Sequence, residues 1–134
     1  SGDKVTLTYG TATAKEIADT KWTQKEIDDG DAPTGADTNT VKTIGLTNEH
    51  KDRISSEAHS RLISTDWYAS RKAEAGTAIP SAVATYRAAV RTAAADMHTK
   101  IDAADTVAKL EALYVYNTDN PPTRPLGAWP TPVE

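Results

Sequence analysis

A chain of 134 residues is long enough for one domain and too short for two of ordinary size. Its 15 lysines and arginines are outnumbered by 19 aspartates and glutamates, and the net charge of −4 disfavours nucleic acid as a partner because no basic stripe is available to neutralise phosphates. The absence of cysteine excludes disulfides and thiolate chemistry, and no apolar run reaches the roughly 20 residues that span a bilayer, so we expect no membrane partner.

The N-terminal region, residues 1 to 46, contains two strand patterns and two helix-start patterns. Residues 5 to 9 alternate apolar side chains with threonine, as a half-buried strand does. Residues 41 to 46 are rich in β-branched side chains and predict a second short strand, ended or distorted by a glycine. Thr13 and Thr23 each stand three residues before a glutamate, which is the spacing of a capping box and predicts either two short helices or one helix with a false start.

An acidic loop is expected over residues 28 to 39, which are mostly turn formers. Its aspartates raise the question of calcium binding, but the ordered ligands and the closing glutamate of an EF-hand are missing. We therefore expect a solvated loop and no metal or other cofactor, and whether the loop orders around an ion stays open. The aspartates concerned are Asp28, Asp29, Asp31 and Asp37.

Helical periodicity dominates residues 47 to 116, so the predicted fold class is mainly α: a helical hairpin plus a short helix, with one or two short N-terminal β-strands. Thr47 is a candidate N-cap for the first helix, whose apolar positions recur at every fourth residue. A pause is expected at residues 64 to 66, before a second helical segment that Gly76 closes in the left-handed conformation.

The longest helix is predicted from residue 81 to about residue 103. Its apolar side chains step by three or four and form one continuous stripe, and Pro80 suits the start of such a helix because first-turn amides have no partner there. We expect residues 48 to 75 to pair with residues 80 to 103 as the hairpin, followed by a closing helix near residue 110. The stripe consists of Val83, Tyr86, Val90, Ala94, Met97 and Ile101.

Residues 117 to 134 contain five of the seven prolines and predict an extended, polyproline-like tail. Such a segment loses little backbone entropy when it docks on a surface. Trp129 must either fold back over the domain or dock on a neighbouring molecule, and the sequence does not decide between the two. Removal of the tail is expected to spare the fold and to weaken partner binding.

No residue pattern points to catalysis, and we expect a protein that is not an enzyme. The chain has no phosphate-binding glycine loop and no nucleophile elbow. No histidine has another at i+3 or i+4, so all three are expected on solvated helix surfaces: His50, His59 and His98. Abundant carboxylates leave a small hydrolase with a carboxylate pair as a further hypothesis.

Three motifs follow one another in the C-terminal part of the chain. Thr65-Asp66-Trp67 comes after a leucine-containing helix end, Tyr86-Arg87-Ala88-Ala89-Val90-Arg91 lies on the longest predicted helix, and Trp129-Pro130-Thr131-Pro132 is near the end. Over about residues 54 to 132, this order resembles the tail-assembly chaperones and tail-fibre-assembly proteins of tailed bacteriophages. The chain departs from them by an additional helix at residues 94 to 116 and by its N-terminal third.

The resemblance implies a protein that binds a phage tail or tail-fibre protein as a chaperone or adaptor, in the host cytoplasm during assembly. The departures leave open a permanent structural component of the virion tail, and self-association into a homo-oligomer is also open. Aromatic rings and arginines are the residue types enriched at interface hot spots. The residues expected to bind the partner are Trp67, Tyr68, Arg71, Tyr86, Arg87, Arg91, Trp129 and Pro130. A place in the core is the competing interpretation for the first tryptophan and for Tyr86.

Overall fold

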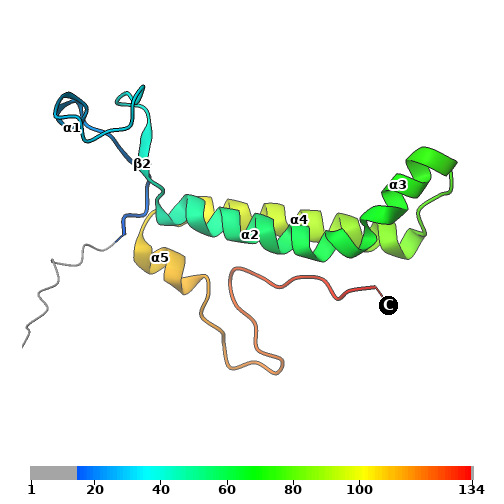
Figure 1. Ribbon diagram of the computed structural model, residues 1–134. Coiled ribbons are helices and arrows are strands. Elements are labelled where there is room, and N and C mark those ends of the chain that lie inside the picture. Colours follow the sequence, from blue (N-terminus) through cyan, green and yellow to red (C-terminus); the bar gives the residue numbers. More distant parts are fainter. Residues whose placement is uncertain (1–14, 134) are drawn as a thin grey trace, which may run out of the picture.

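The computed structural model describes residues 15 to 133, and its main feature is a long antiparallel helix pair (Figure 1). The pair consists of α2 (Leu46–Leu62) and α4 (Ser81–Ala103), which pack along each other. At one end a 3-10 turn (Ile63–Thr65) leads into α3 (Asp66–Ala75), which turns away from the pair. The mainly α fold class is thus confirmed, but the predicted pairing of residues 48 to 75 with α4 is wrong beyond the end of α2.

The short elements lie at the opposite end of the helix pair (Figure 1). β1 (Thr20–Lys21) and β2 (Val41–Thr43) form a two-stranded antiparallel sheet, α1 (Gln24–Asp28) lies between them in sequence, and α5 (Val107–Ala112) follows α4. The strand expected over residues 41 to 46 is therefore shorter than predicted. The strand predicted at residues 5 to 9 and the capping box at Thr13 lie outside the described residues.

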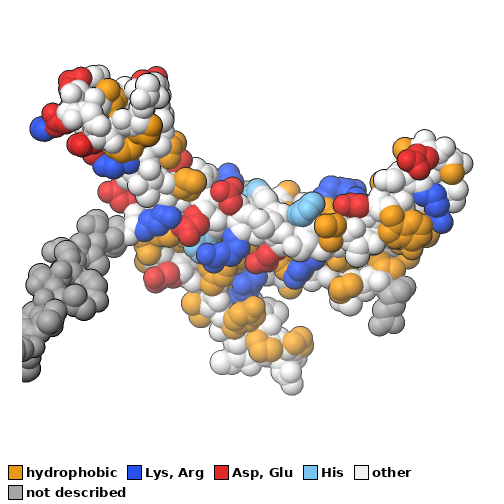
Figure 2. Space-filling view, in the orientation of Figure 1, with side chains coloured by type: hydrophobic (Ala, Val, Ile, Leu, Met, Phe, Trp, Pro, Cys, Tyr) orange, Lys and Arg blue, Asp and Glu red, His pale blue; other side chains and the backbone are white. Residues whose placement is uncertain are grey.

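The exposed surface of the helix pair is strongly polar. Figure 2 shows lysine, arginine, aspartate, glutamate and histidine side chains mixed along the visible side of α2. The opposite side of α2 packs on α4, as in an ordinary amphipathic helix. Among the described residues, no helix combines the length and the apolar character that crossing a bilayer requires.

The capping box predicted at Thr23 is present and begins α1. The Thr23 hydroxyl accepts from the Glu26 amide, and the Glu26 carboxylate accepts from the Thr23 amide at 2.9 Å. Lys42 of β2 pairs with the same carboxylate. The Lys42 ammonium and the Thr23 hydrogen bonds together lower the pKa of Glu26 to about 2. One carboxylate thus both caps a helix and ties it to the sheet.

The start of α2 is set by a neighbouring chain segment, residues 16 to 19. Backbone carbonyls of this segment accept from the amides of Leu46 and Thr47, and Asp19 Oδ1 accepts from the Gly45 amide at 2.7 Å. A Cβ atom on Gly45 would lie 2.2 Å from a backbone carbonyl carbon of the segment, so the close approach requires glycine. The prediction of Thr47 as the N-cap is therefore wrong, and Gly45 takes this position. Backbone carbonyls here supply the hydrogen-bond acceptors that a capping side chain usually supplies.

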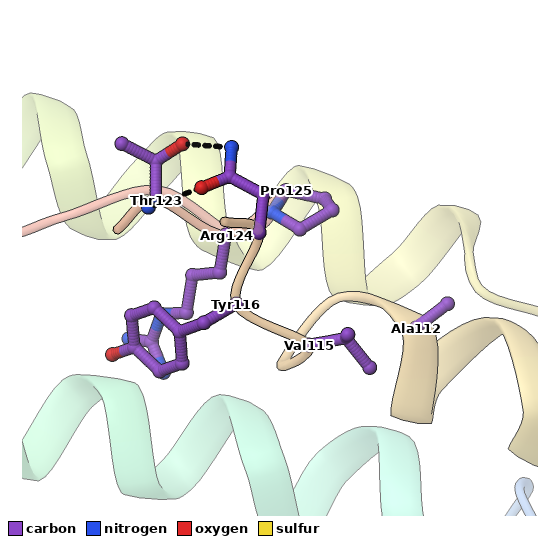
Figure 3. Close-up of a pocket in the computed structure, with 7 residues that line it drawn as sticks. Ala112, Val115, Tyr116, Thr123, Arg124 and Pro125 are labelled. Atoms are coloured by element: carbon purple, nitrogen blue, oxygen red, sulfur yellow. Dashed lines mark hydrogen bonds between the residues drawn. The ribbon is translucent and has the colours of Figure 1, made fainter. Parts of the chain in front are cut away.

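The C-terminal segment bends back toward the helix pair through a closed loop. The Asn117 amide donates to the Thr123 carbonyl at 2.8 Å, and Asn117 Oδ1 accepts from the Thr123 amide at 2.9 Å. Figure 3 shows this loop beside Arg124 and Pro125, with hydrogen bonds between Asn117 and Thr123 dashed. Farther along, the Leu126 amide donates to a carbonyl at the end of α5.

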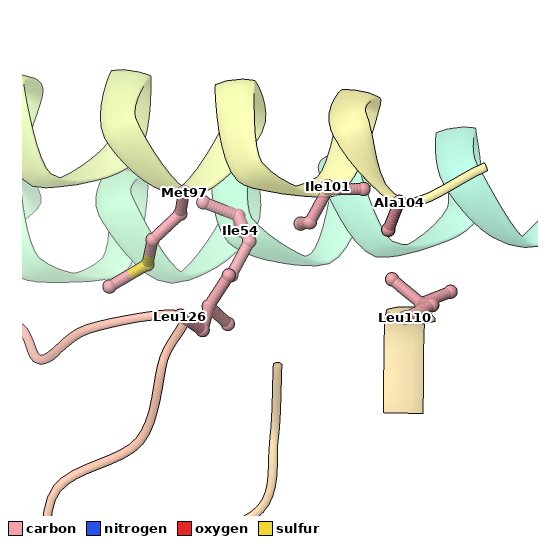
Figure 4. Packing of buried hydrophobic residues seen from close by; sticks show 6 residues of the cluster. All are labelled: Ile54, Met97, Ile101, Ala104, Leu110 and Leu126. Carbon is pink, nitrogen blue, oxygen red and sulfur yellow. The ribbon is translucent and has the colours of Figure 1, made fainter. Parts of the chain in front are cut away.

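The core joins three helices and the tail (Figure 4). Leu126 is only 1% exposed, so a residue from the proline-rich segment completes the core. Full burial of a leucine side chain contributes about 1.5 to 3 kcal/mol to stability. The described part of the tail has no helix or strand, but it folds back and enters the core, so its removal can no longer be expected to spare the fold. The cluster consists of Ile54, Met97, Ile101, Ala104, Leu110 and Leu126.

Candidate functional site

A half-exposed aromatic ring lies on α3, in a cluster that we call the α3 cluster: Trp67, Tyr68 and Arg71. The two rings stack with centroids 3.8 Å apart and planes inclined by 28°. The Arg71 guanidinium lies 4.9 Å from the Trp67 ring centroid and 5.4 Å from that of Tyr68. Trp67 is 51% exposed, and α3 contributes no residue to the buried core. The cluster therefore presents apolar area beside a positive charge to solvent.

Arg87 of α4 holds the junction from which α3 projects. Its Nη1 donates to the Leu62 carbonyl at 3.1 Å, to Thr65 Oγ1 at 2.8 Å and to Asp66 Oδ1 at 2.9 Å. These acceptors come from the end of α2, the 3-10 turn and the start of α3. Gly76, with φ of 71°, closes α3 as predicted. Arg87 therefore positions the α3 cluster through internal contacts.

The remaining α4 residues of the predicted set have different surroundings. Tyr86 is only 6% exposed, so its ring packs in the interior, and the core interpretation is confirmed for this residue. The same interpretation is wrong for Trp67, because α3 leaves the helix pair before this side chain can be covered. Arg91 is exposed on α4.

Trp129 and Pro130 fold back onto the helix pair, which answers the question that the sequence left open. Trp129 Nε1 donates to Glu57 Oε2 at 2.8 Å, and the Arg61 guanidinium lies 4.8 Å from the Trp129 ring centroid. Pro130 lines an open groove of about 440 Å³ beside the first turns of α4, together with Tyr86. The first and last of the three sequence motifs thus lie near α4, which carries the second.

The prediction that all three histidines are solvated is wrong for two of them. His59 is exposed, whereas His50 and His98 are partly buried. His50 Nδ1 shares a hydrogen bond with the Tyr114 hydroxyl across 2.7 Å, because the end of α5 covers this part of α2. Burial, with a smaller effect of the nearby Arg53 charge, lowers the pKa of His50. Burial likewise raises the pKa of Tyr114.

A serine and a histidine meet between α2 and α4, but their geometry does not activate the serine. His98 Nε2 lies 3.0 Å from the Lys51 carbonyl oxygen and 3.2 Å from Ser55 Oγ. A carbonyl oxygen can only accept, so Nε2 carries the hydrogen in this contact. It cannot also take the serine proton, as a general base would have to do.

In the acidic loop, the carboxylate of Asp37 accepts hydrogen bonds from backbone amides of the loop itself. Asp37 Oδ1 accepts from the amides of Asn39 and Thr40 at 2.8 and 3.0 Å, and these bonds lower the pKa of Asp37. Within residues 15 to 133, no three metal-ligating side chains converge on one point. Asp37 therefore acts as a turn former, whereas Asp28 accepts from Gln24 within α1 and Asp29 pairs with Lys25.

An open groove beside α5 was not indicated by any sequence motif. It measures about 580 Å³ and includes Val115 and Tyr116, which are 64% and 60% exposed (Figure 3). The Arg124 guanidinium lies 5.6 Å from the Tyr116 ring centroid and 5.3 Å from that of Tyr114. The groove could not be predicted from local sequence, because residues 123 to 125 of the tail form one of its sides only after the tail folds back.

Comparisons of the chain with protein-family models, with curated proteins and with solved structures found no match. An assignment of function therefore depends on the residues of the chain and on their geometry.

Proposed function

We propose that this chain is a non-enzymatic protein-binding protein that assists phage tail or tail-fibre assembly as a chaperone or adaptor. The observation that carries the proposal is the α3 cluster. A ten-residue helix buries none of its residues, yet it carries a stacked tryptophan and tyrosine with an arginine beside them. Isolated helices shorter than about 12 residues are only marginally stable in water, so packing against a partner's surface would stabilise α3.

The size of the exposed ring supports a binding role. Trp67 leaves half of its surface in solvent. Covering on the order of 100 Å² of such a ring favours association by about 2 to 3 kcal/mol. Tryptophan, tyrosine and arginine are also the residue types that dominate binding energy at protein interfaces.

The phage-tail context comes from the three sequence motifs, and their arrangement is consistent with one functional unit. Asp66 of the first motif accepts a hydrogen bond from Arg87 of the second. Pro130 of the third motif lines a groove with Tyr86 of the second. Residues far apart in sequence thus adjoin one another around the first half of α4. We propose a tail or tail-fibre polypeptide as the partner and the host cytoplasm as the place of binding.

Affinity purification from cells that assemble particles tests this proposal. Tagged wild-type protein is expected to co-purify with a tail or tail-fibre polypeptide, and Trp67→Ala is expected to reduce the recovery about tenfold or more, as removal of a hot-spot tryptophan does. Tyr116→Ala is the matched control, because it removes an exposed aromatic ring outside the α3 cluster. Equal recovery with Trp67→Ala and wild type would count against the α3 cluster as the binding surface.

Mass spectrometry of purified particles separates a chaperone from a permanent component. A chaperone that is released after assembly is expected to be missing from the particles. A fixed copy number per particle would show instead that the chain is a structural component of the virion tail.

A further inference from the structure

The end of the hairpin that carries α3 differs in charge from the rest of the chain. Residues 58 to 95, from the last turns of α2 through α3 to the middle of α4, contain five basic and two acidic side chains, a net charge of +3, with Glu57 and Asp96 directly outside this range. The total charge is −4, so the other residues together carry −7. A partner that approaches the α3 cluster therefore meets a locally positive surface on an acidic protein.

Ion pairs occur in both parts of the chain. Away from α3, five lysines pair with nearby carboxylates, whereas Lys21, Arg53, Lys100 and Arg124 form no ion pair among the described residues; the pairs are Lys15–Glu49, Lys25–Asp29, Lys42–Glu26, Lys51–Asp102 and Lys109–Asp105. At the α3 end, Arg87 pairs with Asp66. Within the part of the chain that the structure describes, the other four basic side chains of this end form no ion pair. They are Arg61, Arg71, Lys72 and Arg91.

Arg71 adds a second observation at the cluster itself. Its Nε atom is buried and has no hydrogen-bond partner among the described residues. The protein itself covers this atom, so a partner would reach the guanidinium through its terminal nitrogens. A carboxylate is the acceptor that best suits a guanidinium group, because two parallel hydrogen bonds form between them.

We propose that the α3 cluster binds an acidic polypeptide segment that carries at least one large apolar side chain. The apolar side chain covers the rings of Trp67 and Tyr68, and a carboxylate of the segment pairs with Arg71. This inference rests on the proposed function and names the chemistry of the partner. A nucleic acid fits less well, because four free cations neutralise few phosphates and the rest of the chain repels them.

Selection from a library of short random peptides tests the inference. The library is selected in parallel on immobilised wild-type protein and on three variants: Arg71→Gln/Lys72→Gln, Trp67→Ala and the control Lys109→Gln. The control removes a positive charge at the other end of the molecule, where it pairs with Asp105. Thermal unfolding of each variant verifies that it is folded.

Wild type and Lys109→Gln are expected to enrich peptides that combine aspartate or glutamate with a large apolar residue. Arg71→Gln/Lys72→Gln is expected to lose the acidic preference and to bind an enriched acidic peptide about tenfold more weakly, and added salt should weaken wild-type binding. Trp67→Ala is expected to lose enrichment altogether.

The contrary outcomes separate the inference from the proposed function. Wild-type enrichment of apolar peptides without an acidic preference would overturn the inference and leave the protein-binding function in place. Enrichment that survives in Trp67→Ala would remove the α3 cluster as the site, and no enrichment on wild type would overturn both proposals. Trp67-dependent binding of a labelled oligothymidylate, or a Trp67-dependent dimer in sedimentation, would show that a nucleic acid or a second copy covers the cluster instead.

Discussion

Arg87, Glu26 and Gly45 each join segments that are distant in sequence. Arg87 reaches three acceptors around the end of α2, and Glu26 serves both α1 and β2. Gly45 allows a neighbouring backbone to cap α2. Each contact satisfies polar groups that the ends of helices leave without partners. At this scale the fold depends on side chains whose partners cannot be found from local sequence.

Val90→Asp tests the core at a single position. Val90 is 0% exposed in the middle of the apolar stripe of α4. An aspartate there buries an unpaired charge, so we expect a loss of roughly 3 kcal/mol or more in the free energy of unfolding, measured by urea denaturation. Val115→Asp, at an exposed valine, should change it by only about 0.5 kcal/mol. Similar stabilities of the two variants would contradict the placement of Val90 in the core.

The lowered pKa of His50 predicts a pH dependence. Burial disfavours the charged imidazole in the folded state, so the unfolded chain takes up a proton at higher pH than the folded one. The stability contributed by neutral His50 is present above the ordinary pKa of 6.5 and is lost as the pH falls below it. Urea denaturation at neutral and mildly acidic pH should show a smaller pH effect for His50→Gln than for wild type, and an equal effect would contradict the buried placement of His50.

The helices differ in how far their sequences predict them. α4 begins and ends as predicted because its apolar stripe repeats over six turns, and Gly76 ends α3 because few other residues adopt a positive φ. The direction of α3 could not be predicted, since Arg87 sets it through acceptors more than 20 residues away. The prolines predicted a tail without helix or strand, but nothing in their spacing indicated that Leu126 enters the core.

Two truncations test the role of the tail as an element. Removal of residues 118 to 134 takes Leu126 out of the core, so we expect a loss of about 2 to 5 kcal/mol, as for other large core deletions. Removal of residues 131 to 134 keeps both Leu126 and Trp129 and should change stability by less than about 1 kcal/mol. The measurement is urea denaturation of both proteins. Equal stability of the longer truncation and wild type would show that the tail is not part of the core.

At the scale of the molecule, the eight residues predicted to bind a partner divide by their environment. Trp67, Tyr68 and Arg71 lie together on α3, and Trp67 is half exposed because this helix turns away from the helix pair. Tyr86 is buried, and Arg87 donates its hydrogen bonds to acceptors at the junction of α2 and α3. Residue type alone predicted the cluster, but separating surface from interior required the fold. Whether the cluster binds a partner remains a prediction.

The molecule is also polar in the distribution of its charge, with a basic α3 end on an acidic chain. Net charge alone disfavoured nucleic acid as a partner. The four basic residues without an ion pair in this part of the chain lie on α3 and on the helices that flank it in sequence. The central claim is therefore that this end of the hairpin is the surface that contacts another protein.

Site-specific photocrosslinking in cells that assemble particles tests this claim most directly. A photoreactive phenylalanine analogue replaces Trp67 in one protein and Tyr116 in another, since both side chains are more than half exposed but lie in different surroundings. We expect position 67 to crosslink to one defined tail or tail-fibre polypeptide and position 116 not to do so. No adduct at position 67, or the same adduct at both positions, would contradict it.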